Sequence, residues 1–114
     1  MSKREYRLFI DDIIESIELI DEYILGMDFE KFKNDRKTID AVVRNLEIIG
    51  EASNNIPASL RDKYSDIDWS GIIGLRNRIA HEYFGISLSI IWNISTRELL
   101  IFKDQIIDIT KDIS

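Results

Sequence analysis

The segment YRLFIDDIIESIELIDEYI, from Tyr6 to Ile24, carries the clearest signal of the fold in this sequence. Its apolar residues recur at alternating spacings of four and three, the period of an α-helix with one buried face. Acidic residues repeat the same rhythm on the opposite face. The apolar set is Tyr6, Ile10, Ile13, Ile17, Ile20 and Ile24, and the acidic set is Asp11, Glu15, Glu18 and Glu22. The stretch therefore predicts a long helix that packs in a bundle and turns its acidic face to solvent.

Turn and capping residues indicate where this helix ends and where the next ones begin. Gly26 is a natural stop for the first helix, and Asp28 can cap a short turn that carries two phenylalanines. A second long helix is expected to start after Asp35 and to end at residues 54–56. It ends there because Pro57 disfavours helical geometry in the residue before it.

The second half of the chain continues the pattern. The proline can open a brief helix that runs to Tyr64, and Asp68 is the expected N-cap of one further helix that runs towards Glu82 and is broken by Gly85. Ser87 can cap the last helix. The expected inward-facing residues are Ile39, Val43, Leu46 and Ile49 or Gly50 in the second long helix, Trp69, Ile72, Leu75 and Ile79 in the next, and Trp92, Ser95, Leu99, Phe102, Ile106, Ile109 and Ile113 in the last.

No stretch shows the sustained two-residue alternation, bounded by turn residues, that would indicate a sheet. The sequence therefore predicts an all-α, up-and-down helical bundle of four main helices with short extra helices. Its 114 residues are 45% apolar, and this length is enough for a single core, so we expect one domain over residues 1–114.

The composition excludes several classes of protein. There is no cysteine, which rules out thiolate metal sites and thiol redox chemistry. The longest apolar run that stands out, Leu99–Phe102, is far shorter than a membrane span. Lys3 and Arg4 lead into acidic residues instead of the apolar stretch of a signal peptide. We therefore expect a cytoplasmic protein with no membrane partner.

Charge is unevenly distributed along the chain. The formal net charge is −6, which argues against a protein that coats nucleic acid through bulk positive charge. Residues 1–35 carry ten acidic against five basic residues, whereas residues 36–114 carry eleven against ten. An anionic ligand would therefore be met by local clusters in the second half of the chain.

Only one segment gathers residues suited to catalysis, GLRNRIAHEY at positions 74–83. It contains the only histidine of the chain, His81, whose unperturbed pKa lets it exchange protons near neutrality. It also contains Arg76 and Arg78, whose planar guanidinium groups suit phosphate. No glycine-rich phosphate loop and no zinc pattern is present, so neither a cofactor nor a metal is expected.

The spacing within this segment is only partly favourable for a shared site. Asn77 lies one helical turn before His81, where its amide could orient the imidazole. Arg76 lies about 140° from His81 around an ideal helix. Its side chain must therefore reach around the helix, or the helix must distort near Ala80, or two protomers must contribute to one site. Tyr83 can join His81 only if the helix ends there.

Ordinary structural roles are the alternative for these residues. A lone histidine near a helix end is commonly a last-turn cation, and a nearby arginine usually pairs with an acid such as Glu82. The acidic face of the first helix lacks the histidines of a helical metal site and is expected to be solvated. Gly50 is expected to permit close helix packing, with Glu51 buried and paired. Both tryptophans fit the apolar stripes and are expected in the core.

The segment RNRIAHEY resembles the R-x4-H-x-Y signature of HEPN-domain ribonucleases, specifically the HepT-type toxins. The three signature positions are Arg76, His81 and Tyr83. The resemblance covers nearly the whole chain: it includes the turn at residues 28–32, Asp40-Ala41-Val42, Ile49-Gly50-Glu51-Ala52, and the approach to the motif from Trp69. It implies a HEPN-like helical fold.

The resemblance also implies a function. It implies a metal-independent endoribonuclease toxin that acts as a homodimer, with RNA as substrate, Arg76 and His81 as catalytic residues, and Asn77 in support. Arg78 is a further candidate for RNA binding. The implied partner is a minimal nucleotidyltransferase antitoxin that transfers AMP onto Tyr83. Two rival classes are a catalytically silent HEPN-type module that binds a nucleotidyltransferase, and a plain helical adaptor.

Overall fold

A computed structural model describes residues 2–83 and 88–113, and for residues 80–83 it describes the backbone alone. The described residues form helices and turns, with no strand among them. The elements, in chain order, are α1 (Lys3–Ile24), α2 (Phe29–Lys33), α3 (Arg36–Asn54), α4 (Ala58–Lys63), α5 (Trp69–Ile73), α6 (Leu75–Tyr83), α7 (Leu88–Asn93), the π-helical segment η1 (Ile94–Glu98) and α8 (Leu99–Ile113). The predicted all-α class is confirmed.

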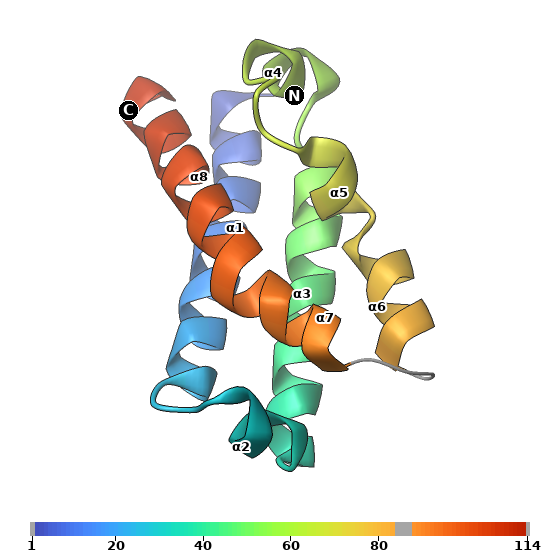
Figure 1. Cartoon of the computed structure of the whole chain (residues 1–114). Helices are drawn as coiled ribbons and strands as arrows, with labels where there is room; N and C mark the ends of the chain where they lie inside the picture. The colour runs from blue at the N-terminus through green and yellow to red at the C-terminus, as the bar shows by residue number, and fades with distance from the viewer. Residues whose placement is uncertain (1, 84–87, 114) are drawn as a thin grey trace.

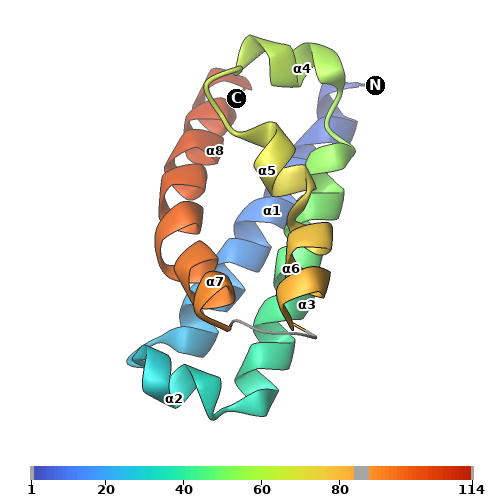
Figure 2. The ribbon, with the colours of Figure 1, turned by 45° about the vertical axis from the view of Figure 1, so that its right-hand side comes forward.

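Three long helices make up the body of the bundle. Helix α1 packs against both α3 and α8, and α6 lies alongside α3 on the side away from α1 (Figure 1). Figure 2 shows the short helix α4 across one end of the bundle and α2 at the other. No helix within the described part of the chain combines the length and the apolarity needed to cross a bilayer.

The helix boundaries have local causes that the sequence predicts. Three aspartates cap helices, since the side chains of Asp28, Asp35 and Asp68 accept hydrogen bonds from the backbone N–H groups of Lys31, Thr38 and Gly71. The bond from Thr38 lowers the pKa of Asp35. Gly26 has a φ of 78°, the left-handed conformation that stops a helix at little cost for glycine alone.

The predicted apolar stripes meet in one core. Every inward-facing isoleucine expected in α1 is buried, and so are those expected in α3, α5, α6 and α8. Trp69 is buried and packs edge to face on Phe102 with ring centroids 6.0 Å apart. Trp92 is half-buried and packs on Phe32 at 5.1 Å. The expected acidic face of α1 is exposed.

The predicted helix from Trp69 to Glu82 is wrong as one continuous element. The chain bends at Gly74, whose φ of −78° and ψ of 2° end α5, and α6 begins at the next residue. Glycine has a low helix propensity, so a break here costs little. At the bend the backbone lies close against α3. A Cβ placed on Gly50 would be only 3.0 Å from the carbonyl oxygen of Ile72.

The last predicted helix also departs from regular geometry. Between α7 and α8 the backbone forms the π-helical segment η1. The hydroxyls of Ser95 and Thr96 donate to the carbonyl oxygens of Ile91 and Trp92 and so compete with the backbone ladder. A π turn inserts extra backbone into a helix and rotates the residues that follow it. The predicted cap at Ser87 lies outside the described residues.

Candidate active site on helix α6

Helix α6 carries the predicted site residues and is held against the bundle by a few contacts. Leu75 and Ile79 are buried in the core and fix one face of the helix. At its start, the backbone of residues 72–73 lies against Gly50 of α3, where no side chain stands between them. The predicted close approach at Gly50 is therefore confirmed, and it determines where α6 begins relative to α3.

Arg76 projects from the first turn of α6 and is exposed. Its side chain makes no ion pair or hydrogen bond with any residue that the structure describes. It lines a depression of about 320 Å³ between α3 and α6, which we call the α3–α6 groove. The groove is lined by Arg44, Glu47, Gly50, Glu51, Asn54, Ile73 and Arg76. The guanidinium is thus available to an anion at this groove.

Arg78 has a different environment. Its guanidinium donates two hydrogen bonds to the carboxylate of Glu98 in η1, at 3.2 and 3.1 Å. These bonds to the Glu98 carboxylate raise the pKa of Arg78, against a lowering effect of burial. The pairing occupies the fork of the guanidinium and ties α6 to η1. Arg78 remains a predicted RNA contact, but its described partner is the Glu98 carboxylate.

The other predicted site residues are only partly described. Asn77 is exposed, one turn before His81 along the helix. The backbone of α6 is helical through His81 to Tyr83, whereas the side chains of these two residues lie outside the described part of the structure. A continuous helix argues against a distortion near Ala80 as the means of bringing Arg76 to His81. Two ways of bringing Arg76 and His81 to one site remain: the Arg76 side chain reaches around the helix, or two protomers contribute to one site.

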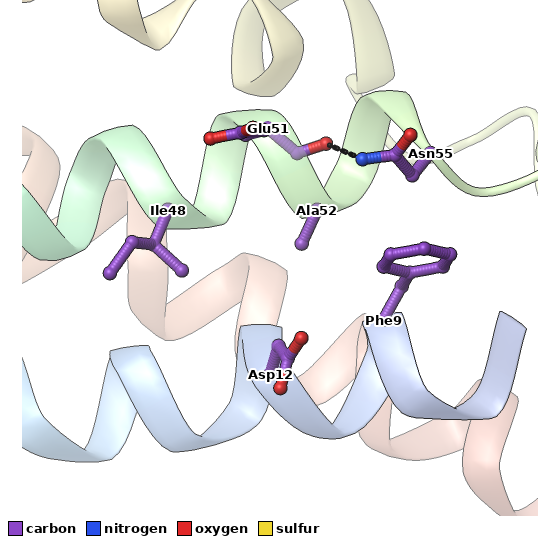
Figure 3. Close-up of a pocket in the computed structure, with 6 residues that line it drawn as sticks. All are labelled: Phe9, Asp12, Ile48, Glu51, Ala52 and Asn55. Carbon is purple, nitrogen blue, oxygen red and sulfur yellow. Dashed lines mark hydrogen bonds between the residues drawn. The ribbon is translucent and has the colours of Figure 1, made fainter. Parts of the chain in front are cut away.

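Glu51 differs from its prediction, because its side chain is exposed instead of buried. It lies at the rim of the α3–α6 groove and also of a second depression between α1 and α3, which Figure 3 shows. In that view its backbone carbonyl oxygen accepts a hydrogen bond from Nδ2 of Asn55, 3.0 Å away. The neighbouring Gly50 and Ala52 take the buried positions, so the helix turns Glu51 outwards.

Sequence reasoning missed three residues near the site: Arg44, Glu47 and Glu98. The first two lie on the stripe of α3 that continues to Glu51 and Asn54, at spacings of three and four, beside the buried Gly50. That polar stripe next to a glycine was the available signal. Glu98 lies 20 residues from Arg78, and no local pattern connects the two.

Among the residues that the structure describes, no three potential metal ligands of the His, Cys, Asp and Glu types come together. The described groups near α6 are instead guanidinium, amide and carboxylate. Such a set can bind a phosphodiester and hydrogen-bond its sugar or base.

Comparison with known proteins gives a consistent result. Residues 13–109 match a family model described as "Ribonuclease HepT-like". The chain is 40% identical over 99% of its length to "Putative RNase MJ0127" of Methanocaldococcus jannaschii, covering 93% of that protein. It is 38% identical over 90% of its length to "Probable ribonuclease HepT" of Thermococcus cleftensis, covering 94%. No solved structure matches the chain significantly.

Proposed function

Because the chain belongs to the ribonuclease HepT-like family, we propose that it is an endoribonuclease whose reaction is carried by Arg76 and His81. The observation that best supports this role for Arg76 is its environment. It is an exposed guanidinium on the motif helix, with no described partner, at the edge of a groove. By contrast, Arg78, two residues later on the same helix, is paired with Glu98, so not every arginine of this helix lacks a described partner.

The proposed reaction needs no metal. The 2′-hydroxyl oxygen of a ribose attacks the adjacent phosphorus, and the bond from phosphorus to the 5′-oxygen of the next nucleotide breaks. A base must take the hydroxyl proton, an acid must protonate the leaving oxygen, and positive charge must stabilise the phosphorane. His81 transfers the protons, Asn77 orients the His81 imidazole, and Arg76 stabilises the negative charge of the phosphorane.

One histidine per chain is the reason to propose a dimer. A single imidazole is not enough to act as base and acid at the same moment, whereas two related by a two-fold axis are. The offset of about 140° between Arg76 and His81 along a continuous helix supports the same arrangement. In this dimer the two α6 helices face one cleft, and each protomer contributes to the site.

Control by a partner completes the proposal. The chain acts as the toxin of a toxin–antitoxin pair, and a nucleotidyltransferase antitoxin transfers AMP to the Tyr83 hydroxyl with release of pyrophosphate from ATP. The added phosphate and nucleoside would oppose RNA binding through bulk and like charge. The second candidate is a catalytically silent module that binds the nucleotidyltransferase. The exposure of Arg76 is compatible with that role too.

The test is RNA cleavage by the purified protein in excess chelator, with light scattering to report the dimer. Arg76→Ala and His81→Ala should each lower the rate at least about a hundredfold, and DNA should resist. Protein adenylylated on Tyr83 by co-expression should cut more slowly. Cleavage that persists in His81→Ala or needs a divalent metal would refute the mechanism. Tight nucleotidyltransferase binding without cleavage would favour the silent module.

A further inference from the structure

The α3–α6 groove contains a second cation, Arg44, that has no ion-pair partner among the described residues and that no part of the proposed reaction uses. Arg44 lines it from α3, Arg76 lines it from α6, and both side chains are exposed. Neither makes an ion pair with a described residue. We propose that this groove binds the single-stranded RNA next to the scissile phosphate, with Arg44 as a second phosphate contact. The inference rests on the proposed ribonuclease function and adds a binding surface to it.

The charge of the chain makes such a local contact necessary. With a net charge of −6, the protein as a whole repels RNA, so attraction must come from individual cations at the site. Three of the other arginines are engaged in ion pairs and are therefore less available for this. Arg7 pairs with Asp11, Arg36 with Asp40, and Arg78 with Glu98. Arg44 makes no ion pair with a described residue, even though Glu47 lies one turn away.

The walls of the groove suit a nucleotide better than a bare anion. The volume of about 320 Å³ lies at the lower end of the range for small-molecule sites. The carboxylates of Glu47 and Glu51 would repel free phosphate, but they can accept hydrogen bonds from ribose hydroxyls and base amino groups. The amide of Asn54 can both donate and accept hydrogen bonds. This mixture of two cations with acceptors between them fits a sugar–phosphate chain.

The position of Arg76 links the groove to the reaction. Arg76 belongs both to the motif helix and to the lining of the groove, so a phosphate beside it and a phosphate at Arg44 can belong to one strand. On α3 the lining residues extend from Arg44 to Asn54, about 15 Å along the helix axis. That length accommodates more than one nucleotide. Arg44 would thus fix the path of the strand while Arg76 acts on the reacting phosphate.

The test measures binding of a fluorescein-labelled single-stranded RNA by anisotropy, in the His81→Ala background so that the RNA stays intact. Arg44→Ala should weaken binding about tenfold and reduce the slope of log K against log salt by about 0.7, the value for one phosphate contact on a single strand. Arg44→Lys should recover part of the loss. Arg4→Ala removes an exposed cation from α1 and should change binding less than about twofold.

The results separate this proposal from the catalytic one. If the parent protein cuts RNA and Arg44→Ala binds RNA as tightly as Arg4→Ala does, the groove proposal is overturned while the ribonuclease stands. If the parent cuts no RNA but Arg44→Ala loses binding and salt dependence, the groove stands and the ribonuclease fails. Equal affinity for DNA of the same sequence would also overturn the assignment, because DNA lacks the 2′-hydroxyls from which Glu47 and Glu51 would accept hydrogen bonds.

Discussion

Replacing Gly50 with alanine tests whether the contact between α3 and the α5–α6 junction positions the site. Two effects of opposite sign compete. In the middle of a helix, alanine is favoured over glycine by about 0.5–1 kcal/mol. Against this, the added Cβ would lie 3.0 Å from the carbonyl oxygen of Ile72 and 3.4 Å from that of Ile73. Both neighbours are backbone atoms, which cannot rotate away as a side chain can.

The steric effect should win. Overpacking typically costs about 1–3 kcal/mol, so we expect Gly50→Ala to lower the free energy of unfolding by about 1–2 kcal/mol after the gain in propensity. For a domain of this size that is a fall in Tm of about 4–8 °C. Any relief comes from moving the start of α6, which carries Arg76. The contact requires a shift of a few tenths of an ångström, and a displacement of about 1 Å at a catalytic group can cost about a hundredfold in rate, so with Arg76 in its proposed role RNA cleavage should fall by about threefold to tenfold.

Thermal unfolding followed by circular dichroism gives the stability, and the chelator assay gives the rate. Gly50→Ser should be worse than Gly50→Ala, because it adds a further atom at the same place. Lys37→Ala, at an exposed position of the same helix, is the control and should stay within about 0.5 kcal/mol of the parent. A Gly50→Ala protein that is more stable than the parent and equally active would refute the reasoning.

Two further predictions concern the contacts that hold the bundle. A double-mutant cycle on Arg78→Ala and Glu98→Ala should give a coupling of about 1 kcal/mol, since the pair is bidentate but each side chain is 36% exposed; additive losses would contradict it. Burial, and then the hydrogen bond that its hydroxyl donates to Asp112, raise the pKa of Tyr64 to about 12. Since the unfolded value is about 10, this contribution to stability is complete below pH 10 and is lost as the pH rises to 12. The alkaline fall in the urea midpoint should therefore shrink in Tyr64→Phe, and an unchanged fall would exclude Tyr64 as its source.

The sequence was sufficient to predict the features that depend on local chemistry. The isoleucine stripe of α1 and the caps at Asp28, Asp35 and Asp68 each follow from residues less than about two turns apart, and the structure has them where the pattern indicates. The bend at Gly74 was not predictable in the same way. The apolar period continues through it from Trp69 to Ile79, and only the proximity of α3 shows why the backbone turns there.

The candidate site shows the same division. The motif identifies Arg76 as a candidate catalytic residue, but whether its guanidinium is paired depends on the residues that surround it in space. Arg78 has the same side chain two residues away and is engaged by Glu98, which η1 brings to it from 20 residues along the chain. Arg44 belongs to no recognisable sequence motif. Only the packing of α6 against α3 makes it a neighbour of Arg76.

Helix α6 has nine residues, too few for a helix that is stable by itself in water. Its position must therefore come from the anchors around it: the burial of Leu75 and Ile79, the contact of its approach with Gly50, and the ion pair with Glu98. Each anchor belongs to a different face or end of the helix. It follows that variants at Gly50 or Glu98, which touch no proposed catalytic atom, should still change the rate by moving Arg76, whereas variants at Arg44 should act on RNA binding with the helix in place.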